Sequence, residues 1–125
     1  MQELQWADMD LSQELHNGLK DCGYINPTEV QQKAIPIALE GKDLIVRSKT
    51  GTGKSAAFLI PSIERTPQDY TQPSCLVLCP SRELAIQVQQ ESARLSTHTP
   101  FTSLAIYGGV SIKAQQEGLA NGAQL

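Results

Sequence analysis

The segment from Asp43 to Ser55 constrains the fold more than any other part of the chain. An apolar, β-prone run at 44–46 is followed by a glycine-containing loop and by the apolar stretch 56–60, which suits a buried helix. Gly51 and Gly53 permit backbone angles that other residues rarely adopt, so successive N–H groups can curve around a phosphate chain. The segment therefore predicts a strand, a phosphate-binding loop and a helix, in that order.

Two side chains of this loop suit phosphate chemistry. Lys54 is predicted to reach the β- and γ-phosphates, and the Ser55 hydroxyl to bind Mg²⁺, so these two are the catalytic candidates. The strict pattern has a glycine where this chain has Ser48, so the match is looser than the strictest form. A glycine-rich turn with an incidental lysine is the alternative. The residues predicted to hold the phosphates are Ser48, Lys49, Thr50, Gly51, Thr52, Gly53, Lys54 and Ser55.

Composition limits the class of protein. The chain has 125 residues, of which 40% are hydrophobic, which predicts one globular domain. A net charge of −3 argues against nucleic-acid binding by bulk electrostatics, so any such contact must be local. No apolar run approaches the ~20 residues that cross a bilayer, and the N-terminus does not resemble a secretory signal. We therefore expect an intracellular protein, cytoplasmic or nuclear, without a membrane partner.

The cysteines and histidines do not form a site in the sequence. Cys22, Cys75 and Cys79 lack the spacing of a metal site, and we expect reduced thiols in the core. His16 and His98 have no ligand or catalytic spacing, and we expect both at the surface.

Two helices are predicted before the phosphate loop. The first spans about 12–22, with Ser12 as its N-cap, and Trp6 and Met9 are expected to pack on the same core. The second begins after Thr28, which forms a capping box with Gln31, and this structural role alone could explain the glutamine. Pro36 is expected to kink or end this helix near residue 35.

Strands and helices are also predicted after the phosphate loop. Pro61 should end the helix that follows the loop, and 66–74 should be a loop. The run 75–79 reads as a fully buried strand of a parallel sheet. Ser81 is a candidate N-cap of the helix that follows it. A strand at 101–107, a turn at Gly108–Gly109 and a helix at 111–119 ending at Asn121–Gly122 complete the chain.

Three stretches resemble motifs of the DEAD-box RNA helicases. GYINPTEVQ, which begins at Gly23, with Trp6 seventeen positions before it, is similar to the Q motif, although the family usually has Phe at the position of Trp6. PSRELAIQ, residues 80–87, is similar to PTRELAxQ with Ser81 in place of Thr. Gly108–Gly109 resembles the glycine pair of the family. The resemblance extends over nearly the whole chain.

The resemblance implies a role for each motif. Gln31 would hydrogen-bond the adenine edge and select ATP over GTP, and Tyr24 would stack on the adenine ring. The phosphate loop would then hold ATP and Mg²⁺. The residues that would contact the RNA backbone are Pro80, Ser81, Arg82, Glu83, Gln87, Gly108 and Gly109. Without the resemblance, Ser81 is an ordinary N-cap, Arg82 and Glu83 are a solvated first turn, and the glycine pair is a plain turn.

The fold class implied is α/β, a parallel β-sheet flanked by helices as in RecA-like P-loop NTPases. Residues 1–125 would form an incomplete first domain, with 1–42 the Q-motif region and 43–125 running from the P-loop through the glycine pair. The TPGR, DEAD and SAT motifs and the second domain of the family do not occur. We therefore expect a helicase fragment that is itself not active, and that self-associates because its apolar strands lack neighbours. Another P-loop NTPase and a non-catalytic RNA- or partner-binding product are the alternatives.

Overall fold

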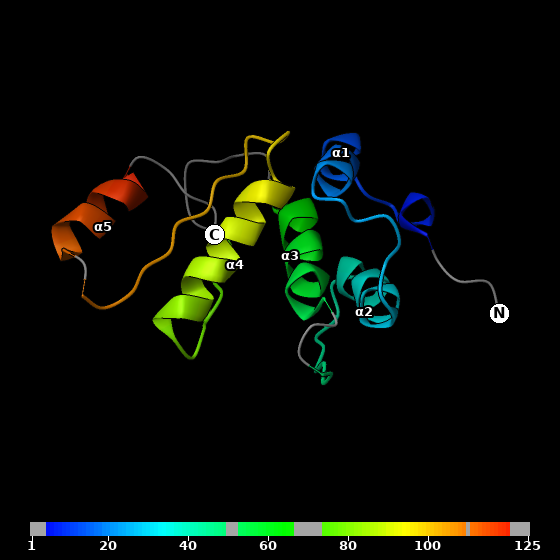
Figure 1. The fold of residues 1–125 in the computed structure, drawn as a ribbon, viewed down its shortest axis with the longest axis horizontal. Helices are drawn as coiled ribbons and strands as arrows, with labels where there is room; N and C mark the ends of the chain where they lie inside the picture. The colour runs from blue at the N-terminus through cyan, green and yellow to red at the C-terminus, as the bar shows by residue number, and fades with distance from the viewer. Residues whose placement is uncertain (1–4, 50–52, 67–73, 110, 121–125) are drawn as a thin grey trace.

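The regular structure is helical throughout the described residues. The structure, a computed structural model, describes residues 5–49, 53–66, 74–109 and 111–120. Helices α1 to α4 lie together as one group, and α5 stands to one side of them (Figure 1). The elements are the 3₁₀ helix η1 (Trp6–Asp8) and the α-helices α1 (Gln13–Asp21), α2 (Glu29–Leu39), α3 (Lys54–Arg65), α4 (Arg82–Leu95) and α5 (Ile112–Ala120).

The three predicted strands are not paired into a sheet within the described residues. The segments 44–46, 74–79 and 101–107 are non-helical and contain no assigned strand. The prediction that 75–79 is fully buried is wrong, because Leu76 and Leu78 are 82% and 86% exposed, and Ile45 is 95% exposed. A parallel strand becomes buried only when strands lie on both sides of it and helices cover both faces. The three segments lack such neighbours here, so their apolar side chains remain at the surface.

The predicted helix N-termini are confirmed. Ser12, Thr28 and Ser81 are the N-caps of α1, α2 and α4. Each side-chain oxygen accepts a hydrogen bond from the backbone N–H three residues later, at 3.3, 3.3 and 3.2 Å respectively. These bonds satisfy N–H groups that have no partner inside the helix.

The prediction that Pro61 ends its helix is wrong, and Pro36, which was predicted to kink or end its helix near residue 35, does not end it. Pro36 and Pro61 lie inside α2 and α3, which continue to Leu39 and Arg65. A proline removes one hydrogen bond from a helix, but tertiary packing can outweigh that loss. The residues around both prolines supply such packing, since Ile35, Ile60 and Pro61 itself are all buried.

The core lies where α3 packs between α2 and α4, and α1 packs against α4. Trp6 and Met9 are buried in it, as expected, at 7% and 6% exposure. The N-terminal segment therefore completes the core of the helical group. The side chains that are fully or almost fully buried are those of Leu15, Leu19, Ile35, Leu59, Ile60, Leu95 and Ser92.

The C-terminal end of α3 also forms hydrogen bonds to α1 and α2. Glu64 accepts a hydrogen bond from the backbone N–H of Ser12 at 3.0 Å, at the start of α1. The Arg65 guanidinium donates to the carbonyl of Leu39 at 3.0 Å, at the end of α2. A cation at a helix C-terminus is favourable for the helix dipole. Two neighbouring residues of α3 thus connect this helix to α1 and to α2.

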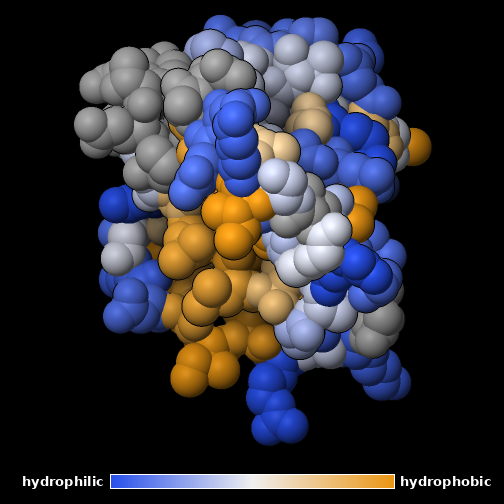
Figure 2. All heavy atoms as spheres, turned by 90° about the vertical axis from the view of Figure 1, so that its left-hand side faces the viewer, coloured by the Kyte–Doolittle hydropathy of each residue, from blue (hydrophilic) through white to orange (hydrophobic). Residues whose placement is uncertain are grey.

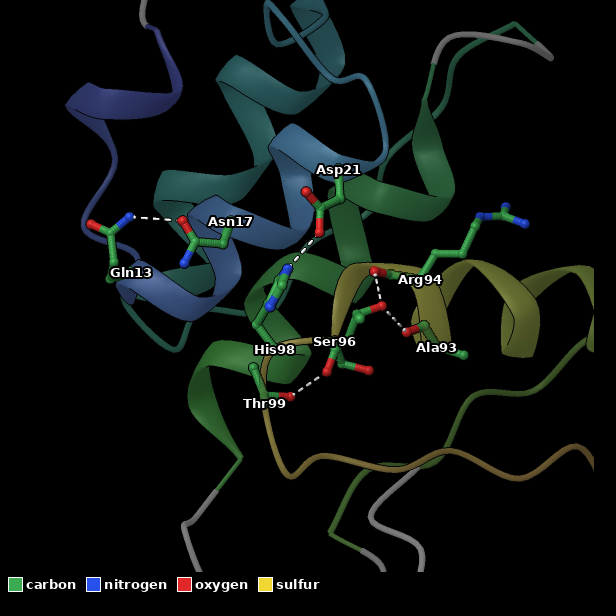
Figure 3. A network of polar contacts seen from close by, with 9 residues as sticks. Gln13, Asn17, Asp21, Ala93, Arg94, Ser96, His98 and Thr99 are labelled. Atoms are coloured by element: carbon green, nitrogen blue, oxygen red, sulfur yellow. Dashed lines mark hydrogen bonds and ion pairs between the residues drawn. The ribbon is translucent and has the colours of Figure 1, made fainter.

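The turn after α4 connects that helix to α1. Thr97 and Thr99 donate their hydroxyl protons to carbonyls of Arg94 and Ser96, at 2.8 and 2.9 Å. His98 then reaches across to Asp21 at the end of α1, with 2.5 Å between Nε2 and Oδ2 (Figure 3). His98 is exposed, as expected. The three cysteines are free, as expected, but each is half-buried rather than fully in the core.

Candidate functional site

The side chain of Gln31 is buried at the start of α2, where it completes the predicted capping box. The side-chain oxygen Oε1 of Gln31 accepts a hydrogen bond from the backbone N–H of Thr28 at 2.9 Å. The backbone N–H of Gln31 in turn donates to the Thr28 hydroxyl at 3.3 Å. Only 3% of the residue is exposed. The local sequence is sufficient for this arrangement, because a Thr followed three residues later by Gln or Glu satisfies two free helix N–H groups reciprocally.

Gln31 also contacts the phosphate loop, across 22 residues of sequence. Its Nε2 donates to the carbonyl of Gly53 at 3.2 Å. Gly53 is the N-cap of α3 and has a φ of 83°, in the left-handed region that favours glycine. A Cβ at this position would lie 2.4 Å from Gln31 Nε2. The capping box and the phosphate loop can therefore meet only because residue 53 has no side chain.

Lys54 begins α3, and its side chain contacts the backbone of Ser48. Its Nζ donates to the carbonyl of Ser48 at 2.5 Å, and the side chain is half-buried. Ser55, the predicted Mg²⁺ ligand, is also half-buried at the second position of α3. Lys49 is exposed. Of the other predicted phosphate contacts, Thr50, Gly51 and Thr52 lie outside the described residues.

The first turn of α3 has the chemistry to bind an anion. Gly53 has no side chain with which to cap the helix, and no acidic residue lies in the first turn. The N–H groups at a helix start have no partner within the helix and carry partial positive charge. Together with the Lys54 ammonium they form a donor set that suits phosphate oxygens.

Tyr24 contacts α4 and Trp6. Its hydroxyl donates to Glu91 Oε1, and its ring lies 6.4 Å from the Trp6 ring, with 35° between the planes. Burial, followed by the hydrogen bond to the Glu91 carboxylate, raises the pKa of the Tyr24 phenol. Among the described residues, Tyr24 therefore contacts Glu91 of α4 and Trp6, and not Gln31. The phenol ring is thus held at one edge and packed on one side.

The two predicted RNA-contact segments approach each other. Ser81 and Arg82 begin α4, and both are exposed. Gly109 has a φ of 87°, and a Cβ there would lie 3.1 Å from Arg82 Nη1. The guanidinium and the glycine pair therefore share one surface, although 27 residues separate Arg82 from Gly109. Pro80, Glu83, Gln87 and Gly108 are exposed as well.

The sequence and the backbone of this chain match one family of enzymes. A family model described as DEAD/DEAH box helicase matches residues 28–125. The chain belongs to this family. A probable ATP-dependent RNA helicase, ddx6 of Dictyostelium discoideum, is 42% identical over 106 residues, which are 85% of this chain and 25% of the relative. The DEAD-box helicase RhpA of Helicobacter pylori strain B128 is 37% identical, over 94% of this chain and 24% of the relative.

Solved DEAD-box structures share the backbone arrangement. A DEAD box protein from Methanococcus jannaschii superposes with a TM-score of 0.89 at 36% identity, over 96% of this chain and 33% of that chain. The RNA helicase Prp28 from Chaetomium thermophilum, bound to ADP, gives a TM-score of 0.87 at 38% identity, over 96% of this chain and 30% of that chain. This DEAD/DEAH-box chain thus spans about a quarter of the length of its curated relatives.

Some features of this family member were not predicted from its sequence. Glu91 lies 67 residues from Tyr24, and no spacing rule connects a tyrosine to a carboxylate on a distant helix. The contact of Gln31 with Gly53 depends on how α2 and α3 pack, and that of Lys54 with Ser48 on the path of the backbone before α3, so only the structure shows them.

The described residues offer neither a metal cluster nor a membrane span. They contain no group of three or more His, Cys, Asp or Glu side chains that could hold a metal ion. Within the same ranges, no helix has the length and apolar character that a membrane span requires.

Proposed function

We propose that this chain carries the adenine-reading and phosphate-binding part of an ATP-dependent RNA helicase. The observation that carries the proposal is the hydrogen bond from Gln31 to Gly53, at 3.2 Å. Gln31 is predicted to read the base and Gly53 to bind phosphate, so a direct bond between them supports one shared nucleotide site. The relatives are named as ATP-dependent RNA helicases, which supports this activity over that of another P-loop NTPase such as a nucleotide kinase.

The free hydrogen-bonding capacity of Gln31 suits adenine. Within the described residues Oε1 accepts one bond and Nε2 donates one, which leaves one lone pair and one N–H of the amide. Adenine presents N6–H₂ as a donor beside N7 as an acceptor, which matches this pair. Guanine presents two acceptors, O6 and N7, so O6 would face the glutamine oxygen. Gln31 would therefore favour ATP over GTP, and Tyr24 would supply a ring surface for the base.

The residues of the phosphate loop fit ATP with Mg²⁺. The N–H groups of the first turn of α3 and the ammonium of Lys54 would bind the phosphates, with Lys54 exchanging the carbonyl of Ser48 for a phosphate oxygen. The Ser55 hydroxyl would be a ligand of Mg²⁺. The bound ion would neutralise charge that develops during phosphoryl transfer. The N–H groups and Lys54 would position the phosphates and stabilise the same developing charge.

The surface shared by Arg82 and Gly109 would contact the RNA backbone. An arginine at the start of a helix, beside a glycine whose backbone is accessible, suits a phosphodiester. Such contacts position a strand without reading its sequence, which agrees with a chain of net charge −3 that binds locally. Ser81, Glu83, Gln87, Pro80 and Gly108 complete the proposed contact.

The finer fold assignment and the activity of the whole protein are parts of the same proposal. The segments at 44–46, 75–79 and 101–107 would be strands of a parallel, RecA-like sheet that is completed by further polypeptide. The high TM-score to a DEAD box protein three times as long supports this arrangement. The whole enzyme would couple ATP binding and hydrolysis to the unwinding of RNA duplexes inside the cell.

Calorimetric titration with Mg·ADP and Mg·GDP tests the nucleotide site. We expect the chain to bind ADP in preference to GDP. Gln31→Ala removes both the acceptor and the donor that would read the base, so we expect this variant to bind the two nucleotides without preference. Lys54→Ala should lose affinity for both nucleotides, because it removes the phosphate contact and leaves the base contact. Lys33→Ala, at an exposed position on α2, is the matched control.

Equal affinity of the unaltered chain for ADP and GDP would contradict base reading by Gln31, which would then be a helix cap only. A Lys54→Ala variant that binds ADP as tightly as the unaltered chain would contradict the phosphate site.

A further inference from the structure

The backbone of Tyr24 is fixed by the way in which α1 ends. The N–H of Tyr24 donates to the carbonyl of Leu19 at 3.0 Å. The N–H of Gly23 donates to the carbonyl of Lys20 at 3.1 Å, and Gly23 has a φ of 78°, in the left-handed region that favours glycine. These two bonds form a Schellman motif, which satisfies free carbonyls at the end of a helix. The Cα of Tyr24 therefore has a defined position relative to α1.

The side chain of Tyr24 is held at its tip and beside its ring. The hydroxyl donates to Oε1 of Glu91 on α4, and the ring lies 6.4 Å from the ring of Trp6. A hydrogen bond to an ionised acceptor is roughly twice as strong as one between neutral groups. Because a tyrosine side chain has only two rotatable bonds, contacts at its backbone, ring and hydroxyl together define the orientation of the ring.

Helices α1 and α4 hold the two ends of this side chain at a fixed separation. Gly18 of α1 lies against the backbone of Leu95 in α4, where an added Cβ would be 2.1 Å from the carbonyl oxygen. His98, just after α4, contacts Asp21 at the end of α1 (Figure 3). The helix that presents the carboxylate is therefore packed directly on the helix that holds the tyrosine.

The contacts of Tyr24 are separate from the segments that further polypeptide would complete. Figure 2 shows hydrophobic side chains gathered in a band on the side of the molecule where α5 lies. In the proposed fold, the extended segments 44–46, 74–79 and 101–107 receive further strands. Among the described residues, the partners of the Tyr24 side chain belong to η1 and α4 and not to these segments. The orientation of the ring thus does not depend on how those segments are covered.

Packing alone does not require a carboxylate beside this ring. A phenylalanine would give the same ring surface without removing a hydroxyl from water. Tyr24 and Glu91 are both half-buried, and burial, followed by the hydrogen bond to Glu91, raises the pKa of the phenol. The phenol therefore stays protonated and remains a donor at neutral pH. The pair acts as a fixed donor and acceptor, which favours one orientation of the ring.

We propose that Glu91 is a positioning residue for the base contact, because its carboxylate holds the Tyr24 ring in the orientation in which that ring would stack on adenine. The inference rests on the proposed function, in which Tyr24 supplies a ring surface for the base. Stacking depends on how the two ring faces are aligned. A ring that is fixed before binding loses little conformational freedom when the base arrives. Glu91 should therefore increase the affinity for ligands that contain the base, and not the affinity for phosphate alone.

Calorimetric titration with Mg·ADP and with Mg·pyrophosphate separates the base contact from the phosphate contact. The unaltered chain should bind ADP more tightly than pyrophosphate. Glu91→Ala should weaken ADP binding about 2- to 10-fold, as expected when one side chain is freed, and leave pyrophosphate binding unchanged. Both ligands are anions, so pyrophosphate also controls for the negative charge that is lost. Glu117→Ala, which removes an exposed carboxylate from α5, is the matched control.

Three further variants distinguish positioning of the ring from a connection between helices. Glu91→Gln keeps an oxygen that can accept from the Tyr24 hydroxyl, so it should restore most of the ADP affinity. Tyr24→Phe keeps the ring but loses the bond, so it should weaken ADP binding as Glu91→Ala does. The double variant should lose no more affinity than either single one, because both substitutions remove the same bond. Circular dichroism checks that each variant is folded.

Trp6 provides a spectroscopic readout of the same contact. It is the only tryptophan in the sequence, and its ring lies near that of Tyr24. ADP should change the fluorescence of Trp6, pyrophosphate should not, and the change caused by ADP should be smaller in Glu91→Ala.

The possible results separate this inference from the proposed function. A Glu91→Ala variant that binds ADP as tightly as the unaltered chain would overturn the inference and leave the nucleotide site standing. Equal losses of ADP and pyrophosphate affinity, or a loss that Glu91→Gln does not restore, would also overturn it, because the effect would then come from structure or charge. An unaltered chain that binds ADP no more tightly than pyrophosphate would contradict the base contact itself, and with it both proposals.

Discussion

At the scale of single residues, the side chain of Gln31 combines a structural and a proposed functional role. Its carbonyl oxygen caps α2 through Thr28, while its amide nitrogen reaches Gly53. The first contact fixes the orientation of the amide plane, because an amide has its donor and acceptor at fixed positions. A side chain held in this way loses little conformational freedom when it binds a base, which favours selectivity.

Tyr24 predicts a pH dependence of stability. The pKa of its phenol is raised in the folded state, so the proton stays bound there at a pH where the unfolded chain, with a pKa of about 10, begins to lose it. The contribution of Tyr24 to the free energy of unfolding is therefore complete below about pH 9 and falls as the pH rises above about 10. We expect Tyr24→Phe to be less stable near neutral pH by about 1 kcal/mol, and to lose less stability at alkaline pH.

Urea unfolding at several pH values between about 7 and 11 would measure this difference. Tyr107→Phe is the control, because it removes a phenol from outside the contact with α4. Burial also raises the pKa of the Cys22 thiol, so part of the alkaline loss should remain in Tyr24→Phe. Parallel stability curves for the unaltered chain and Tyr24→Phe would refute the assignment to Tyr24.

At the scale of helices, the contact between α1 and α4 depends on Gly18. A Cβ at this position would lie 2.1 Å from the carbonyl oxygen of Leu95, so the backbones of the two helices approach more closely than any side chain allows. Ala is favoured over Gly in a helix by about 1 kcal/mol. The clash is with backbone atoms that are themselves part of a helix, and steric overlap in a packed core costs about 1–3 kcal/mol.

We therefore expect Gly18→Ala to lower the free energy of unfolding by up to about 2 kcal/mol, with overpacking outweighing helix propensity. Chemical denaturation would measure the change. Asn17→Ala is the matched control, since Asn17 is exposed on the same helix and Ala should be neutral or slightly stabilising there. A Gly18→Ala variant as stable as Asn17→Ala would contradict the close approach of the helices.

At the scale of the whole molecule, α5 is less firmly held than α3. Six side chains of α3 are buried, whereas in α5 Ile112 is 72% and Leu119 36% exposed. The described attachments of α5 to the preceding segment are the hydrogen bond from the Tyr107 N–H to Gln115 at 2.8 Å and the proximity of Gly118 to Leu104. Few buried apolar contacts imply a low free energy of local opening.

Hydrogen exchange measured by mass spectrometry or NMR should therefore show amides of α5 exchanging at least about 100-fold faster than those of the buried turns of α3 around Leu59 and Ile60. Equal protection of α5 and α3 would show that α5 belongs to the same cooperative unit.

The sequence predicted most local features correctly, because they depend on neighbouring residues. Ser12, Thr28 and Ser81 cap helices through bonds that span three residues, and the motif spacing was sufficient to identify the family. Features that depend on tertiary packing were not predicted correctly from local sequence rules. Pro36 and Pro61 remain inside helices because buried neighbours offset the lost hydrogen bond, and Leu76 and Leu78 are exposed because strands need partners that no local pattern supplies.

The sequence by itself determined which residues have the chemistry for a nucleotide and for an RNA backbone, since that chemistry depends on side-chain type and spacing. Only the tertiary structure decided which of them meet. Gln31 reaches Gly53, Tyr24 reaches Glu91 and Arg82 lies beside Gly109 across separations of 22, 67 and 27 residues. Contacts at such distances depend on how the helices and extended segments pack, and packing is a property of the whole chain.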